Sequence, residues 1–250
     1  MHWDRGFPNG FSLMDAGPSS KGTRGGTPSV QPRGQENPGL WSMLPEAFDV
    51  MREAPGALPL AYRWRDRGLR FEALGRMGLI GVLPVVGVLD CEDLARLRRA
   101  LDGVDHAFRA LVLEVDSPGG TVEGLELMGA RVRSLRQRCR VVSVVTGVAA
   151  GSALWLAAQA SEVFASPSAR VGCLAVQGGD EEERRRIAGD LLAGLSAARG
   201  RAFQEGDMDK LHPARKAALI GLVSGVQTLD ETIRRLAKER PRRAEGRSVR

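Results

Sequence analysis

Between residues 79 and 239, short apolar runs alternate with longer amphipathic stretches. Leucines and valines recurring three or four positions apart on those stretches predict helices, and branched apolar runs predict strands. The predicted strands are 79–89 (a strand pair or one bent strand), 110–115, 141–146, 163–165 and 171–176. The predicted helices are 91–101, 121–136, 152–160, 181–198 and 229–238, with a short helical piece around 208–221. This alternation predicts an α/β fold with right-handed crossovers between parallel strands.

The rest of the chain has weaker patterning. Residues 1–40 are rich in Gly, Pro, Ser and Arg without periodicity, which predicts a disordered N-terminal arm. Residues 41–78 form a poorly defined lead-in, with a short helix possible at 44–51. Residues 79–239 form the main domain, and 240–250 form a basic tail, expected to be solvated.

One uncharged run, 141–161, has about the length of a transmembrane helix. Its first six residues are largely β-branched, Gly147 interrupts it, and an Ala- and Leu-rich stretch follows. A buried strand, a turn and a buried helix explain this division, so we expect no membrane span.

Composition narrows the functional classes. The net charge is +6 and comes almost entirely from arginine, since lysine occurs only at 21, 210, 216 and 238. Arginine usage of this kind often follows the base composition of the genome, and contact with nucleic acid or an acidic partner is the alternative. We expect no nucleic-acid partner. The cysteines at 91, 139 and 173 have no metal-ligand spacing, so we expect no metal, no cofactor and no disulfide, in a reducing cytoplasm.

The first candidate for chemistry is Asp116-Ser117-Pro118-Gly119-Gly120, between a predicted buried strand and a predicted helix. Paired glycines allow backbone N–H groups to face outward, and a helix N-terminus behind them adds positive potential. Gly119 and Gly120 could therefore form an oxyanion hole. An ordinary strand-to-helix turn would favour the same residues.

The second candidate is the stretch from Gly147 to Ala157. Ser152 is predicted in the first turn of a helix that directly follows a strand, where a nucleophile can be exposed and adjacent amides can meet an oxyanion. Serine at such a position also commonly caps the helix.

Taken together, these motifs resemble the signal peptide peptidase A family, and most nearly its phage prohead-protease branch. The motifs that carry the resemblance are 116–120, the small-residue turn at 147–153, 165–172, 198–201 and 218–230, within a span of roughly 79–236. The resemblance implies the Clp protease/crotonase-like fold of repeated β-β-α units, with a mostly parallel sheet and C-terminal helices. It also implies homo-oligomers.

Two positions depart from the family's pattern. The nucleophile column that follows the Ala-Ala pair holds Gly151, and serine comes one residue later at Ser152. The family's base is a lysine, yet the matching segment is shortened to 177–180 and contains none. Arginine cannot replace it because it stays protonated. The other candidates for the base are Lys210, Lys216, His2, His106 and His212, and none lies at the family position.

Three hypotheses follow. In the first, the chain is a serine endopeptidase, active in capsid maturation in a bacterial host cytoplasm or a phage prohead. Ser152 attacks an extended peptide, Gly119 and Gly120 with the amide of Ala153 bind the oxyanion, and the general base is unknown, with a neighbouring subunit as one source. In the second, the chain is a catalytically inactive relative that serves as a structural or peptide-binding assembly component. In the third, it is a crotonase-like acyl-CoA enzyme, for which no adenine or pantetheine recognition is visible.

Overall fold

The computed structural model describes residues 39–53, 70–73, 79–104 and 108–239. All of them belong to one compact unit, Pro32–Arg250. The expected N-terminal arm (except residues 39 and 40) and the basic tail lie outside the described residues, as does His106. Domain boundaries therefore stay predictions.

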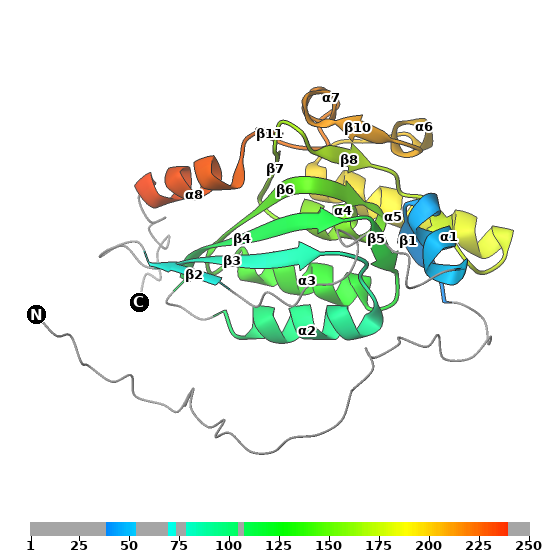
Figure 1. The fold of residues 1–250 in the computed structure, drawn as a ribbon, viewed down its shortest axis with the longest axis horizontal. Coiled ribbons are helices and arrows are strands. Elements are labelled where there is room, and N and C mark those ends of the chain that lie inside the picture. The colour runs from blue at the N-terminus through cyan, green and yellow to red at the C-terminus, as the bar shows by residue number, and fades with distance from the viewer. Residues whose placement is uncertain (1–38, 54–69, 74–78, 105–107, 240–250) are drawn as a thin grey trace, which may run out of the picture. The chain divides into compact units, whose positions relative to one another are not determined.

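The centre of the unit is a sheet of eight strands within the described residues, and most neighbouring pairs in it are parallel (Figure 1). Its order is β10-β8-β6-β4-β3-β2, and β7, which pairs with β6, carries β11. The strands are β2 (Arg70–Ala73), β3 (Leu79–Val86), β4 (Phe108–Ser117), β6 (Arg140–Ala150), β7 (Glu162–Ala165), β8 (Arg170–Gly172), β10 (Leu211–Pro213) and β11 (Gly225–Val226). Only β2 and β10 run antiparallel to their neighbours in this sheet.

Both faces of the sheet are apolar, because successive side chains of a strand point to opposite faces. In β4, Leu111, Leu113 and Val115 enter the larger core, whereas Ala110 and Val112 enter a smaller one on the other face. Burial on both faces explains why the predicted strands are continuous apolar runs rather than alternating ones.

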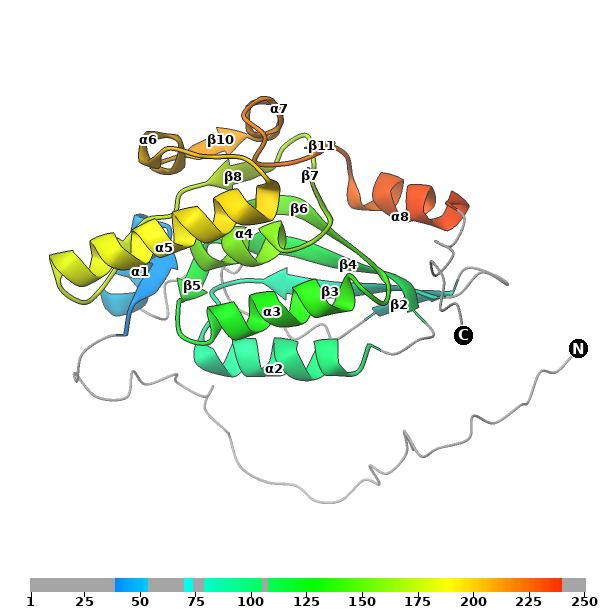
Figure 2. The same ribbon diagram turned by 180° about the vertical axis from the view of Figure 1, so that it is seen from behind.

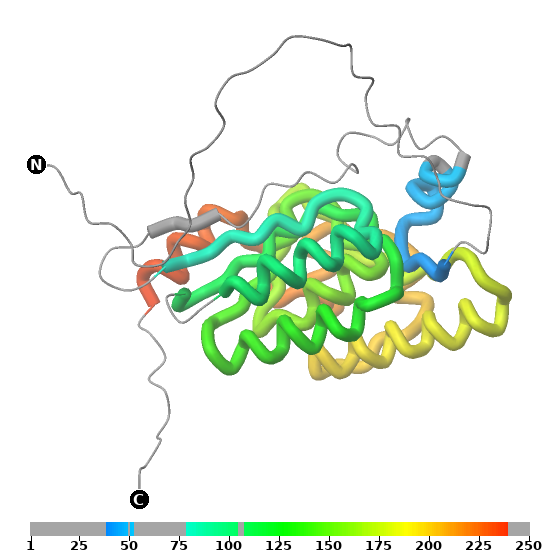
Figure 3. Tube along the Cα trace, turned by 90° about the horizontal axis from the view of Figure 1, so that it is seen from below, coloured from blue at the N-terminus to red at the C-terminus, as the bar shows by residue number. Residues whose placement is uncertain are grey.

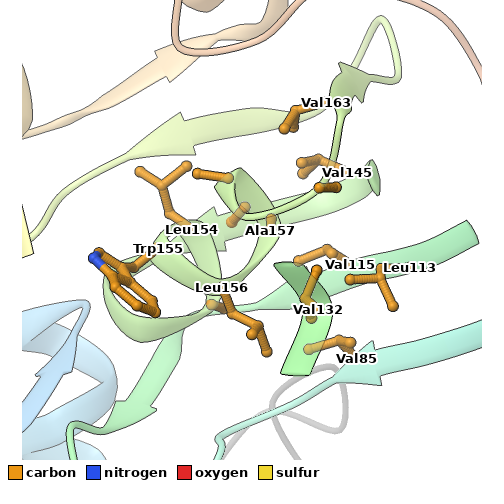
Figure 4. Packing of buried hydrophobic residues seen from close by; sticks show 14 of the residues in the cluster. Val85, Leu113, Val115, Val132, Val145, Leu154, Trp155, Leu156, Ala157 and Val163 are labelled. Carbon is orange, nitrogen blue, oxygen red and sulfur yellow. The ribbon is translucent and has the colours of Figure 1, made fainter. Parts of the chain in front are cut away.

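Helices α2 (Cys91–Asp102), α3 (Leu125–Leu135), α4 (Gly151–Ala158) and α5 (Glu181–Arg199) cover the larger core (Figure 2). The side chains of α4 lie at the centre of this packing (Figure 4). Trp155 of α4 packs so closely against α3 and α5 that a Cβ at Gly129 or Gly194 would lie 2.5 Å from its ring. Glycines at these two positions therefore allow the three helices to approach one another.

The other face is covered by α8 (Leu229–Lys238), whose Ile233 and Leu236 pack on β3, β4 and β6 (Figure 1). Between α5 and α8 come α6 (Glu205–Met208) and α7 (Ala214–Leu219), on either side of β10.

A second, small sheet lies at the C-terminal ends of the parallel strands (Figure 1). Figure 3 shows the segment that begins it, in blue, at one end of the unit. The small sheet consists of β1 (Trp41–Met43), β5 (Gly119–Thr121) and β9 (Val176–Gln177), and β1 leads into α1 (Pro45–Glu53). The poorly defined lead-in expected at 41–78 thus contains β1, α1 and β2.

Three sequence predictions need correction. The helical piece expected around 208–221 contains the strand β10, and its helix α7 begins only at Ala214. The helix expected from residue 121 begins at Leu125, because Gly119–Thr121 pair with β1 as a strand instead. The N-terminus of α3 therefore does not stand directly behind Gly120. The strand expected at 171–176 is divided into β8 and β9, since Cys173 between them has a left-handed backbone with φ 60°.

The uncharged run 141–161 forms most of β6, the whole of α4 and the turn after it, as its internal division predicted. Among the described residues, no helix is long and apolar enough to cross a membrane.

Candidate functional site

The two sequence motifs meet at one edge of the main sheet. They follow β4 and β6, which are parallel neighbours, and Ser117 pairs with Ala149 where these strands end. Parallel strands end at the same edge, so the loops after them lie side by side. We use the word crevice for the space between these loops, which β1 fills. The carbonyl of Ser42 lies close to the Cα atoms of both Gly119 and Gly151, which brings the two glycines to one place.

Asp116 and Ser117 fix the shape of this edge. The N–H of Val148 donates to Asp116 Oδ1 at 2.9 Å, so the carboxylate ties the end of β4 to β6. Glycine is required at 147 because a Cβ there would lie 2.2 Å from the same oxygen. The N–H of Gly119 donates to Ser117 Oγ at 3.2 Å, which holds the turn before β5.

Gly151 is the first residue of α4. Its φ of 52° lies in the left-handed region that side chains rarely adopt. Its N–H donates to the carbonyl of Cys173 at 2.7 Å. A Cβ at this position would lie 1.8 Å from the oxygen and 2.2 Å from the carbon of the Ser42 carbonyl.

Ser152, the predicted nucleophile, lies in the first turn of α4 and is fully buried, as is Ala153. Its Oγ has no hydrogen-bond partner among the described residues, so no base there is within hydrogen-bond reach. It does not cap the helix either, since Ala150 occupies the cap. The role of Ser152 stays a prediction.

None of the candidate bases that the structure describes is hydrogen-bonded to Ser152 Oγ. Lys210 and Lys216 are exposed. His212 is buried and its Nε2 lies 2.7 Å from the carbonyl oxygen of Asp207. His2 and His106 lie outside the described residues.

Two cysteines among the described residues lie near this edge, and neither thiol is activated. The Sγ of exposed Cys91 lies 4.0 Å from Thr121 Oγ1, and partial burial raises its pKa. Cys173 is buried, and this burial raises the pKa of its thiol, which keeps it protonated. The described residues also contain no cluster of His, Cys, Asp and Glu that could hold a metal.

Sequence reasoning missed the strand that fills this crevice. β1 lies between β5 and β9 and is antiparallel to both; Ser42 is opposite Gly120 on one side and Val176 on the other. Backbone hydrogen bonds continue on both sides of the strand. On one side, the N–H of Leu44 donates to the carbonyl of Pro118 at 2.9 Å, and the N–H of Val122 donates to the carbonyl of Leu40 at 3.1 Å. On the other side, the N–H of Met43 donates to the carbonyl of Ala175 at 3.2 Å. Three residues are too few to show an alternating pattern, so no periodicity could have revealed β1.

The side chains of β1 are buried as well as its backbone. Ser42 and Met43 are both fully buried, and Ser42 Oγ has no partner among the described residues. Met43 packs in a small apolar cluster with Leu44, Phe48, Ala150 and Cys173. The backbone of β1 is therefore paired with a strand on each side, and the side chain of Met43 is enclosed by the apolar cluster.

Comparison with solved structures identifies this architecture. The chain superposes on the crystal structure of the ClpP protease catalytic domain from Plasmodium falciparum with a TM-score of 0.50 and 16% identity, covering 59% of this chain and 85% of that one. The described domain has the ClpP fold. This confirms the predicted α/β class with a mostly parallel sheet.

Sequence comparison finds similarity over a shorter part of the chain. No protein-family model matches the chain. It is 34% identical over 76 residues to Protease 4 from Salmonella typhi, a stretch that covers 30% of this chain and 12% of that protein. The chain thus matches only a small part of the length of this curated relative.

Proposed function

We propose that this chain is a non-hydrolytic relative of the Clp and signal peptide peptidase A class of serine peptidases. It keeps the crevice in which an extended peptide strand is held but does not cleave the strand. In this role it is a structural or peptide-binding component of a homo-oligomeric assembly, and the sequence resemblance favours a phage or prophage head.

The observation that carries the proposal is Gly151. The resemblance of the sequence motif assigns the family's nucleophile position to this residue, and a Cβ added here would lie 1.8 Å from the carbonyl oxygen of Ser42. A serine or cysteine side chain at this position would face that carbonyl, but glycine has no side chain to supply a nucleophile. The crevice can therefore hold a peptide bond in place without attacking it.

The environment of Ser152 supports the same conclusion. A serine hydroxyl needs a base to become a nucleophile, and Ser152 Oγ is buried without any hydrogen-bond partner among the described residues. Arginine, the abundant cation of this chain, cannot serve as that base.

A second candidate function is a serine endopeptidase with Ser152 as nucleophile, the amides of Gly119, Gly120 and Ala153 as oxyanion hole, and head proteins as substrates. The local similarity to Protease 4 favours it. This function has two requirements. The first turn of α4 must shift so that Ser152 Oγ becomes exposed, and another subunit must supply the base.

A fluorophosphonate probe separates the two candidates. Full-length protein and its Ser152→Ala variant are incubated with the probe, and intact mass is measured together with hydrolysis of a denatured protein substrate. We expect no adduct and equal background hydrolysis in both. An adduct on wild type that is absent from Ser152→Ala would overturn the proposal in favour of the endopeptidase. Ser166→Ala, in the turn after β7, is a matched control for loss of a serine outside this crevice.

A further inference from the structure

The groove between β5 and β9 is filled by the chain's own residues. Within the described residues, β5 and β9 belong to a three-stranded sheet in which β1 is the central strand. Without β1, their facing edges would present unpaired N–H and C=O groups across a gap of one strand. Such a gap is a site for β-strand addition by an extended peptide.

The sides of this groove leave room for the backbone of an occupant because two residues that line them have no side chain. Cβ atoms at Gly119 and Gly151 would lie 2.3 Å and 1.8 Å from the carbonyl oxygen of Ser42. Both glycines therefore let the main chain of the occupant approach closely. The next residue of the occupant, Met43, enters the pocket beside Ala150 and Cys173.

Most of the apolar contacts of this strand lie outside the two large cores, although Leu40 packs against the larger one. The buried residues of the two clusters on the faces of the main sheet include none from 41–53. The buried residues of β1 and α1 instead form a cluster of their own with Ala150 and Cys173. Regions with a separate apolar cluster can open as a unit while the remaining core stays folded.

We infer that residues 40–44 are a tethered strand that occupies the peptide groove in cis and leaves it to admit an extended peptide. The admitted peptide has a small residue at the place of Ser42 and an unbranched apolar residue at the place of Met43. This inference rests on the groove of the proposed function but not on the absence of hydrolysis. An adduct at Ser152 would overturn the proposed function and make the strand an inhibitor of an active site.

The first measurement is binding of a labelled peptide with the sequence of residues 39–46 to full-length protein, followed by fluorescence anisotropy. Met43→Asp places an unpaired charge in the apolar pocket and should release the strand. We expect Met43→Asp to bind the peptide at least about ten-fold more tightly than wild type, because the competing occupant has left. Leu127→Asp, which places the same charge on an exposed leucine of α3, should bind as weakly as wild type. A peptide with Asp in place of Met should bind none of them.

Hydrogen–deuterium exchange provides the second measurement. In Met43→Asp we expect faster exchange at 40–44, 119–122 and 175–177, with β4 and β6 as protected as in wild type. The milder Met43→Ala should show the same local pattern, which keeps the test valid if Met43→Asp does not fold.

Three results would overturn the inference. If exchange in Met43→Ala accelerates as much in β4 and β6 as at 40–44, β1 opens only together with the main core and is not a separate strand. A released strand with no peptide binding would show that the groove admits no other occupant. Wild-type dimers on size-exclusion chromatography that the peptide converts to monomers would place the strand of a second copy in the groove, in trans.

Discussion

The carbonyl oxygen of Ser42 lies so close to the Cα of Gly151 that a Cβ at position 151 would be 1.8 Å away. A side chain at the start of α4 and a strand at the place of β1 therefore exclude each other. The absence of a side chain at 151 and the presence of β1 beside it are two aspects of one arrangement.

Gly151→Ala tests this relationship. Both the left-handed φ of 52° and the contact with Ser42 oppose a side chain. We expect the free energy of unfolding to fall by about 2–4 kcal/mol, as for other substitutions that combine strain with a core clash. Urea unfolding followed by circular dichroism measures it, and exchange at 40–44 should rise.

The matched control is Gly189→Ala in the middle of α5, where a Cβ would meet nothing within 4 Å. Alanine favours a helix over glycine, so stability should rise by up to about 1 kcal/mol. Equal losses in the two variants would show that Gly151 has no special contact.

Ser152→Ala addresses the buried hydroxyl. Ser152 Oγ is buried without a partner among the described residues, and such a group destabilises a fold. Its removal should leave stability unchanged or raise it by up to about 1 kcal/mol in urea unfolding. A loss of more than about 1 kcal/mol would reveal a hydrogen bond that Ser152 makes in solution.

The sequence was most informative where structure is local. The helix predicted at 229–238 is α8, whose Thr228 and Glu231 form a capping box, and the run at 141–161 divides into β6 and α4 at its small residues. The glycine at 151 was likewise visible in the sequence, although only the structure shows that its φ is positive and that Ser42 lies against it.

The parts of the fold that the sequence analysis did not predict depend on contacts between segments far apart in the chain. Gly119–Thr121 form a strand only because Trp41–Met43, some eighty residues earlier, pair with them. A three-residue strand carries no periodic signal, and the propensity of the following residues for a helix could not show that the helix starts later. The occupation of the groove is therefore a property of the fold that no local pattern contains.

Asp116→Ala tests how the two motif loops are held together. The N–H of Val148 would lose its acceptor at Asp116 Oδ1, a bond of 2.9 Å. We expect a loss of about 1–2 kcal/mol in urea unfolding and faster exchange of the Val148 amide. Asp116→Asn keeps a carbonyl oxygen at the same place and should lose less, whereas equal losses would assign the effect to charge.

The last prediction concerns pH and Asp93, which is buried in the first turn of α2 and shares a capping box with Asp90. Burial, and then the negative charge of Asp90, raise the pKa of Asp93 from 3.8 to about 7, although Arg96 opposes this. The folded state thus holds a proton that the unfolded chain has lost between about pH 4 and pH 7, so stability falls as pH rises through this range. At 1.36 kcal/mol per unit, the change should reach as much as about 4 kcal/mol.

Urea unfolding of wild type and Asp93→Asn from pH 4 to pH 8 measures this effect. The asparagine variant carries no charge at 93, so it should gain stability relative to wild type as pH rises and be the more stable of the two above pH 7. Asp102→Asn, on the exposed end of the same helix, should keep the wild-type slope, because Asp93 is still present. If Asp93→Asn and wild type follow parallel curves over the whole range, Asp93 is ionised in the folded state and α2 begins with a charged pair that water or a cation stabilises.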